Sequence, residues 1–235
     1  GGGAAHRRHG PRARRRGRIA GHRVTLPASE SAQPRQTLAL REAVAMGCDE
    51  AILLSAREFA GADTWATAYT LAQAIRKLGE YDIIFCGKQA IDGDTGQVGP
   101  GIAKQLDIPQ LTYVFKIRAI DFAARHVTAE RLLEEGREIV SAPLPALLTV
   151  VKDINQPRYP TFRGIRTARK MTIPVWTSAD LDVQASYLGL DGSPTKVVRV
   201  FTPPKREGKV VIIGGDDPAE QADSLSDKLL AEKVI

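Results

Sequence analysis

Hydrophobic and polar positions alternate between helical and strand-like patterns from Thr37 onwards. Apolar side chains recur on one side of a helix after Thr37, and Gly47 stands where that helix would end. Residues 51–54 form a short apolar run bounded by charged residues. Such a run is typical of a strand buried on both faces of a parallel sheet.

A second helix and strand repeat this order. Asp63 or Thr64 caps a predicted helix that runs to about Leu78, and Gly79 ends it. The next predicted strand covers residues 81–86, which are again mostly apolar. This order predicts an α/β fold with a doubly wound, mostly parallel sheet, helices on both of its faces and right-handed crossovers.

The pattern changes to closely spaced strands after residue 110. These segments predict a meander or an added sheet edge. They are residues 112–120, 126–132, 137–141 and 146–151. The chain then ends in an extended C-terminal tail, with short apolar runs at 197–200 and 210–213 and a helix capped at Asp216 or Asp217 with Pro218 in its first turn.

Residues 1–36 have a different composition, mainly Gly, Ala, Arg, His, Pro and Ser. They carry too few periodic apolar residues to offset the entropy of ordering, which predicts disorder. A nucleic-acid-binding arm, an organelle targeting segment and an artefact of truncation or reading frame are three explanations. We favour the artefact, because the chain does not begin with Met and the segment lacks the aromatic residues or helical pattern of a nucleic-acid arm.

The net charge of +6 is concentrated at the start of the chain. Residues 1–23 contain eight arginines and no acidic residue. Without those eight, 25 of the 33 basic residues remain against 27 acidic residues, so the rest of the chain is close to neutral. The charge therefore does not indicate a nucleic-acid partner for the folded part.

The remaining composition indicates a soluble, intracellular protein. Hydrophobic residues make up 43% of the chain, and no apolar run approaches the roughly 20 residues of a membrane-spanning helix. No signal-peptide pattern is seen. Cys48 and Cys86 are far apart, without a second ligand at metal spacing, so both are expected to be buried, reduced thiols.

The glycine-rich segment 87–100, with the sequence GKQAIDGDTGQVGP, follows a predicted strand directly. Ligands of open parallel sheets bind at the carboxyl ends of the strands, where a turn into a helix offers backbone N–H groups to a phosphate. Its glycine spacing is neither the dinucleotide fingerprint nor a phosphate-binding P-loop. On spacing alone, a tight connection with Asp92 and Asp94 capping the next helix is equally open. No third carboxylate or histidine lies nearby to favour a metal or general-acid site, and no catalytic residue is predicted.

Four segments together closely resemble the beta subunits of electron transfer flavoproteins, over about residues 37–235. They are residues 87–100, 108–113 (IPQLTY), 144–165 (LPALLTVVKDINQPRYPTFRGI) and 193–197 (SPTKV). The resemblance implies an adenine nucleotide alpha hydrolase-like, Rossmann-like fold in which one loop holds the phosphates of an adenine nucleotide. The implied loop residues are Gly87, Lys88, Gln89, Ala90, Ile91, Asp92, Gly93, Asp94, Thr95, Gly96, Gln97 and Val98.

The resemblance leaves two nucleotides open at this loop. Simple carriers hold a structural AMP there, and their single redox FAD lies mainly on the alpha subunit. In electron-bifurcating members the loop carries a second FAD that is reduced by NADH. The small or neutral residues Gly93, Thr95 and Val98 look like the bifurcating and nitrogen-fixation-associated group, which favours FAD. An electron carrier of this kind needs no acid, base or nucleophile of its own.

A second implied site is the Pro-rich segment 155–165, expected as an ordered loop. In the family such a loop inserts an apolar anchor, here Phe162, into an acyl-CoA dehydrogenase-like or quinone reductase partner. The alternative is that Phe162 covers the protein's own core. The implied partner-binding residues are Arg158, Tyr159, Phe162, Arg163, Arg166 and Arg169, with Lys170 in the basic surround.

These inferences predict three regions: a disordered or artefactual segment at 1–36, a truncated nucleotide-binding domain at 37–185, and a tail and helix at 186–235 that pack on an alpha-type partner subunit. Family members begin with a further strand, so the first strand and its nucleotide contacts are expected to be missing. A cytoplasmic location in a bacterium or archaeon is expected. A stand-alone nucleotide sensor of the universal stress type and a nucleic-acid-binding protein remain alternatives.

Overall fold

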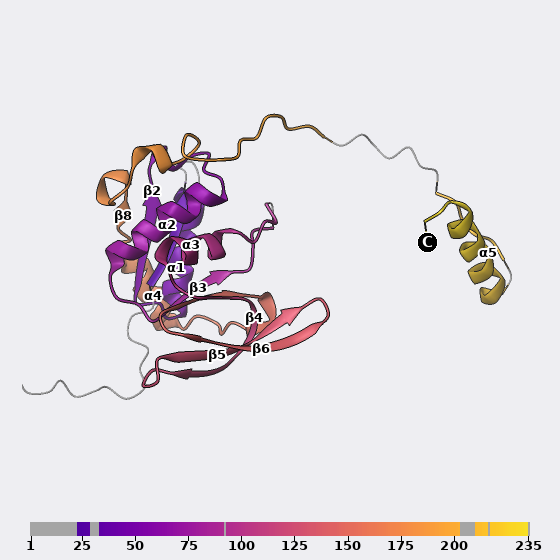
Figure 1. The fold of residues 1–235 in the computed structure, drawn as a ribbon, viewed down its shortest axis with the longest axis horizontal. Helices are drawn as coiled ribbons and strands as arrows, with labels where there is room; N and C mark the ends of the chain where they lie inside the picture. Colours follow the sequence, from indigo (N-terminus) through magenta and orange to yellow (C-terminus); the bar gives the residue numbers. More distant parts are fainter. Residues whose placement is uncertain (1–22, 29–32, 92, 203–209, 216, 235) are drawn as a thin grey trace, which may run out of the picture. The chain divides into compact units, whose positions relative to one another are not determined.

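The computed structural model describes residues 23–28, 33–91, 93–202, 210–215 and 217–234 of the chain. The chain divides into two compact units, Gly1–Lys196 and Val197–Ile235 (Figure 1). The strands of the first unit are β1 (Arg23–Ala28), β2 (Glu50–Ser55), β3 (Ile83–Gly87), β4 (Gln110–Asp121), β5 (His126–Leu133), β6 (Gly136–Pro143), β7 (Ala146–Val150) and β8 (Val175–Trp176). Its α-helices are α1 (Gln33–Met46), α2 (Thr64–Leu78), α3 (Val98–Leu106) and α4 (Phe162–Lys170).

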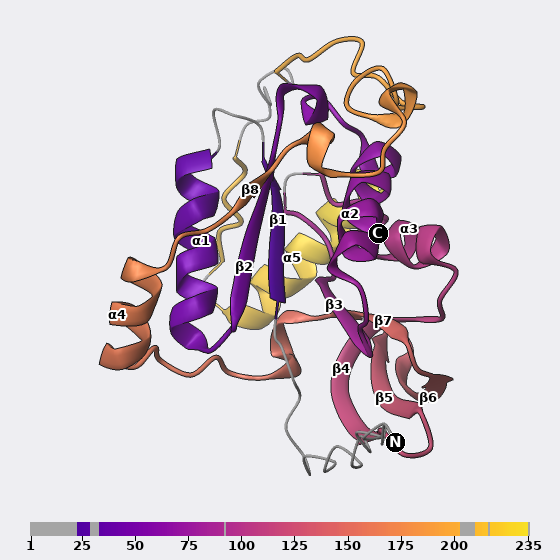
Figure 2. The ribbon, with the colours of Figure 1, turned by 90° about the vertical axis from the view of Figure 1, so that its left-hand side faces the viewer.

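Strands β1, β2 and β8 form a three-stranded parallel sheet with β2 in the centre. Successive side chains of a strand point to opposite faces. On β2, Leu53 packs with Leu40 of α1 and Ala168 of α4, while Leu54 lies in a separate core cluster with Tyr69 of α2. Helices therefore cover both faces of this sheet (Figure 2).

The other five strands form a mixed sheet in the order β3-β7-β4-β5-β6. Strand β7 lies between β3 and β4 and is parallel to both, whereas β4, β5 and β6 form an antiparallel meander. Leu147 of β7 packs against Ile102 and Ala103 of α3, and Leu148 faces the core of the meander together with Val127. The structure confirms the predicted α/β class, with the strands arranged in two sheets. The predicted meander is confirmed for β4, β5 and β6, whereas the fourth predicted strand, β7, lies inside the sheet and is parallel to its neighbours.

Two element boundaries differ from those predicted. Helix α1 begins at Gln33 rather than near Thr37, and α4 begins at Phe162, inside the segment expected to be a loop. The Thr161 side chain accepts a hydrogen bond from the Gly164 N–H at 3.0 Å, which caps α4. The prolines of that segment obscured this capping threonine, whose pattern is an ordinary helix start.

Strand β1 corrects the expectation for the start of the chain. It pairs in parallel with β2 along its whole length, so the prediction of disorder is wrong for 23–28 and 33–36. Averaging composition over 36 residues hid Val24 and Thr25, which are residue types enriched in strands. Residues 1–22 and 29–32 lie outside the described part of the chain.

The boundary between the units lies after Lys196 rather than after residue 185. The Leu190 N–H donates to the Ala60 carbonyl at 3.0 Å, which joins this segment to the first unit. Short 3-10 helices occur at Arg57–Phe59, Lys152–Ile154, Ser178–Asp180 and Ala185–Tyr187. In the second unit, α5 (Pro218–Ala231) starts as predicted, because Asp217 accepts a hydrogen bond from the Ala219 N–H at 3.2 Å and caps it.

Candidate functional site

The predicted phosphate loop lies at the carboxyl end of a parallel strand. Strand β3 ends at Gly87, and the next residue, Lys88, donates its N–H to the Val150 carbonyl at the end of β7, at 2.9 Å. Helix α3 begins at Val98, so the loop runs directly from strand to helix. This is the position at which α/β sheets bind ligands.

The loop is folded by its own backbone and side chains. The Asp94 N–H donates to the Ala90 carbonyl at 3.0 Å, and the Gln89 side-chain amide donates to the Asp94 carboxylate. Asp94 and Gly96 both have a positive φ, of 49° and 63°, which turns the chain sharply. Asp94 therefore stabilises the turn and does not cap α3. Asp92 lies outside the described residues.

The N-terminus of α3 has the character of an anion site. Gln97 stands at the N-cap position, and among the described residues no side chain caps this helix. The first N–H groups of a helix carry a partial positive charge and need an acceptor. Nothing lies within 4 Å of a Cβ built on Gly87 or Gly93, so there is open space beside the loop backbone. These features fit the phosphates of a nucleotide.

A second helix N-terminus converges on the same edge. The Thr64 hydroxyl, at the start of α2, donates to the Gln97 side-chain carbonyl at 2.8 Å. The Asp63 carboxylate caps α2 by accepting from the N–H groups of Trp65 and Ala66 at 2.9 and 3.0 Å. A Cβ built on Gly101 would lie 2.8 Å from the Ala68 Cβ, so the small residues allow α2 and α3 to approach closely.

Asp63 also fixes the end of the first unit, a role that sequence reasoning missed. Its second carboxylate oxygen accepts hydrogen bonds from the Thr195 N–H and hydroxyl, at 3.0 and 2.8 Å, and its N–H donates to the Ser193 hydroxyl at 2.8 Å. The SPTK segment is thereby tied to the start of α2. Asp63 and Thr195 are 132 positions apart in the sequence, which explains why no local pattern revealed this hydrogen bond.

These bonds also shift the pKa of Asp63. Burial acts to raise it, but the hydrogen bonds from Ala66, Thr195 and Trp65 outweigh burial, so the pKa lies below its ordinary value of 3.8. Because the pKa is lowered in the folded state, the ionised carboxylate stabilises the fold at pH values above its ordinary pKa. That contribution is lost as the pH falls through the lower pKa of the folded state.

Replacing Asp63 by alanine is expected to lower the free energy of unfolding by more than about 1 kcal/mol, the usual loss for one helix cap, because the tie to Thr195 is lost as well. Urea unfolding at neutral pH measures the change. Thr161→Ala is the matched control, since Thr161 caps α4 by accepting a hydrogen bond from Gly164 within its own helix. Equal losses for the two variants would contradict a structural role for the tie.

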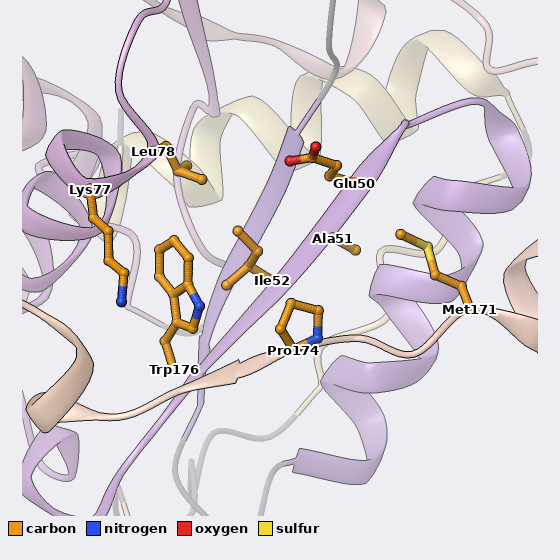
Figure 3. Close-up of a pocket in the computed structure, with 8 residues that line it drawn as sticks. All are labelled: Glu50, Ala51, Ile52, Lys77, Leu78, Met171, Pro174 and Trp176. Carbon is orange, nitrogen blue, oxygen red and sulfur yellow. The ribbon is translucent and has the colours of Figure 1, made fainter.

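Neither of two hollows on the first unit is lined by the loop. One pocket of about 330 Å³ is lined by the first half of β2, the last turn of α2 and the segment before β8. Figure 3 shows the Lys77 side chain beside the Trp176 ring in this pocket, and the ammonium lies 4.3 Å from the ring centre. A hollow of about 1080 Å³ lies between the end of α1 and the segment from Arg158 to Met171.

The predicted partner segment exposes its aromatic side chains. Tyr159 is 92% and Phe162 is 93% exposed, so the alternative in which Phe162 covers the core is wrong for this chain. Arg163, Arg166 and Arg169 are exposed on α4. Arg158 is also exposed, but its guanidinium donates to the Met46 carbonyl, with Nε at 3.0 Å, and so closes the end of α1.

Helix α4 is held firmly on α1. The Arg41 guanidinium donates to the carbonyls of Ala168, Arg169 and Met171 at the end of α4. Gly164 lies so close to the Ala45 carbonyl that a Cβ there would overlap it. Phe162 is therefore presented at the start of a fixed helix, not on a free loop.

The thiols show no sign of activation. Burial raises the pKa of Cys86 to about 11, and burial together with the neighbouring Asp49 raises the pKa of Cys48. Within the described part of the chain, no group of three or more His, Cys, Asp or Glu side chains is placed to hold a metal ion. The described residues also contain no helix long and apolar enough to cross a membrane.

Residues 13–181 match the electron transfer flavoprotein domain. The chain belongs to the electron transfer flavoprotein family. The match starts at residue 13, well before Thr37. The family membership agrees with the resemblance drawn from the sequence and with the Rossmann-like α/β fold.

Several curated relatives cover most of the chain. It is 50% identical to the electron transfer flavoprotein subunit beta of Megasphaera elsdenii, over 83% of this chain and 74% of that protein. It is 44% identical to the caffeyl-CoA reductase-Etf complex subunit CarD of Acetobacterium woodii, over 86% of this chain and 76% of that protein. It is 45% identical to the protein FixA of Bradyrhizobium diazoefficiens, over 80% of this chain and 67% of that protein.

Proposed function

We propose that this chain is the beta subunit of a heterodimeric electron transfer flavoprotein and binds an adenine nucleotide at residues 87–98. The observation that carries the proposal is the glycine-rich loop at the end of β3, which leads into an α3 N-terminus without a side-chain cap among the described residues. The 50% identity to a beta subunit supports it. Together with an alpha subunit, the chain would pass electrons from a donor to an acceptor.

Side chains and backbone N–H groups of the loop would contact different parts of the nucleotide. The side chains of Lys88, Thr95 and Gln97 are suited to the phosphates or ribose, and the backbone N–H groups of 95–97 are suited to the negative charge. Thr64 orients Gln97 through their 2.8 Å hydrogen bond. FAD, when bound, supplies the redox chemistry, and the chain contributes binding and electrostatics.

FAD is the proposed nucleotide, with AMP as the alternative. The sequence DGDTGQVGP, with small residues at Gly93 and Thr95, resembles the bifurcating and nitrogen-fixation-associated group. The identities to CarD and FixA support the same assignment. The proposal therefore includes reduction by NADH and division of the electron pair between two acceptors. A further FAD would lie mainly on the alpha subunit.

The partners are proposed from the exposed segments. Phe162 and Tyr159 would dock an acyl-CoA dehydrogenase-like or quinone reductase partner, surrounded by Arg163, Arg166 and Arg169. In the second unit, exposed apolar side chains would pack on the alpha subunit; they include Val197, Val198, Val200, Val210 and Ile212. A cytoplasmic location in a bacterium or archaeon is part of the proposal.

The test is the nucleotide content of the complex. The full chain is co-expressed with an electron transfer flavoprotein alpha subunit, and nucleotides released from the purified heterodimer are quantified by chromatography. Two FAD per heterodimer are expected. One FAD and one AMP would make the protein a simple carrier, and failure to find a nucleotide beyond the alpha subunit's FAD would refute the loop assignment.

A further inference from the structure

Tyr113 of β4 has a backbone conformation that is unusual for a bulky residue. Its φ is +57°, in the left-handed region. It lies where the pairing of β4 with β7 is irregular, between Leu111 and Val114. Irregularities of this kind re-aim side chains and occur next to functional sites.

A buried threonine holds this conformation. The Tyr113 N–H donates to the Thr149 hydroxyl of β7 at 3.1 Å, and Thr149 is only 2% exposed. The Thr149 methyl group lies against Gly99, where a built Cβ would be 2.5 Å from it. Thr149 thus connects the irregular point of β4 with the first turn of α3, beside the phosphate loop.

The re-aimed Tyr113 ring lies next to the first side chain of the loop. The Lys88 ammonium is 5.0 Å from the centre of the ring, within the range of a cation–π interaction. The Lys88 backbone is fixed by its 2.9 Å bond to Val150. The ring of Tyr113 and the backbone bond together restrict where the ammonium can lie.

The identity of the residue indicates that the ring is used. A left-handed position is most easily filled by glycine or asparagine. Tyr113 is also 39% exposed and belongs to none of the hydrophobic core clusters of the described residues. Tyr113 combines a strained backbone with a contact to the lysine of the glycine-rich loop. This combination favours a role at the site over a role in turning the chain.

We infer that Tyr113 is a positioning residue that holds the Lys88 ammonium against a phosphate of the bound nucleotide. The inference rests on the proposed function, since it needs a nucleotide at residues 87–98. It adds a residue from outside that loop, placed by the fold through Thr149. Tyr113 acts through Lys88, so its effect on binding is expected to depend on that lysine.

The experiment uses the heterodimer of the full chain with an alpha subunit, after the nucleotide at residues 87–98 has been removed. Binding of FAD and, separately, of AMP is measured by calorimetric titration. Tyr113→Gly and Tyr113→Asn are expected to weaken binding about 3- to 30-fold, the range of one cation–π interaction. Tyr113→Phe keeps the ring and should bind within about twofold of wild type. Tyr113→Gly relieves the left-handed strain, so its thermal unfolding temperature should not fall.

A double-mutant cycle separates positioning from a structural role. In a Lys88→Met background, Tyr113→Gly should weaken binding by less than about twofold, because the ring no longer has an ammonium to hold. Lys77→Met removes the other described lysine–aromatic pair, at Trp176, and should leave nucleotide binding unchanged.

The outcomes distinguish this inference from the proposed function. If wild type binds nucleotide and Tyr113→Gly binds equally well, or weakens binding equally with and without Lys88, the positioning role is refuted and the proposed function stands. If wild type binds neither FAD nor AMP beyond the alpha subunit's FAD, the proposed function fails and the inference fails with it.

Discussion

Gly99→Ala is expected to lower the free energy of unfolding by about 1–3 kcal/mol, the usual range for an overpacked core, and to reduce the nucleotide retained by the complex. Gly99 is buried in the first turn of α3, and its new Cβ would lie 2.5 Å from the Thr149 methyl group. Alanine improves helix propensity by up to about 1 kcal/mol, which is too little to offset the overlap. The N-terminus of α3 must then move.

Two further variants make this prediction specific. Thr149→Ser removes the obstructing methyl group and keeps the hydroxyl that accepts the Tyr113 N–H, so Gly99→Ala combined with Thr149→Ser should recover most of the lost stability. Gly93→Ala is the control in the same loop, because nothing lies within 4 Å of its built Cβ. Urea unfolding measures all of them. A double variant no more stable than Gly99→Ala would show that the methyl overlap is not the cause.

Local patterns predicted the parts of the fold that local interactions determine. Helix α2 runs from Thr64 to Leu78 with Asp63 as its cap and Gly79 after it, as expected from capping residues. The meander followed from short apolar strands separated by turns. Strand β1 was missed because its ordering comes from pairing with β2, a partner that begins more than 20 residues later.

The candidate site was predicted only where it is contiguous. The loop at 87–98 stood out by its glycines and its family resemblance, and the structure places it at the end of β3. Three hydrogen bonds of the site join distant positions: Thr64 to Gln97, Thr195 to Asp63, and Tyr113 to Thr149. Their partners are 33, 132 and 36 positions apart in the sequence. No helical or strand period links such positions, so only the fold reveals them.

In segment 155–165, too, the sequence predicted residue types but not the structure that carries them. Its aromatic and basic residues were recognised from the sequence, but a proline-rich run gave no sign that α4 begins at Phe162. The backbone contact of Gly164 with α1 depends on how two distant helices pack. That packing makes the segment a rigid support, which would reduce the entropy lost on binding the proposed partner.

Phe162→Ala is expected to weaken binding to the proposed dehydrogenase-type partner by about 2 kcal/mol or more, roughly 30-fold, as for an interface hot spot. Because the side chain is 93% exposed, the free energy of unfolding should change by no more than about 0.5 kcal/mol. The measurement is the dependence of the electron-transfer rate on the concentration of a dehydrogenase that reduces the wild-type heterodimer, together with urea unfolding.

The matched control for Phe162 is Phe122→Ala, which removes another exposed aromatic side chain, in the turn between β4 and β5. It should leave partner binding unchanged. Arg166→Ala should slow association and reduce its dependence on salt, because a charge at the rim of an interface acts mainly on the encounter rate. If Phe162→Ala binds the dehydrogenase as tightly as wild type, the docking surface lies elsewhere, and the exposure of Phe162 must be explained by a different contact, such as one with the alpha subunit.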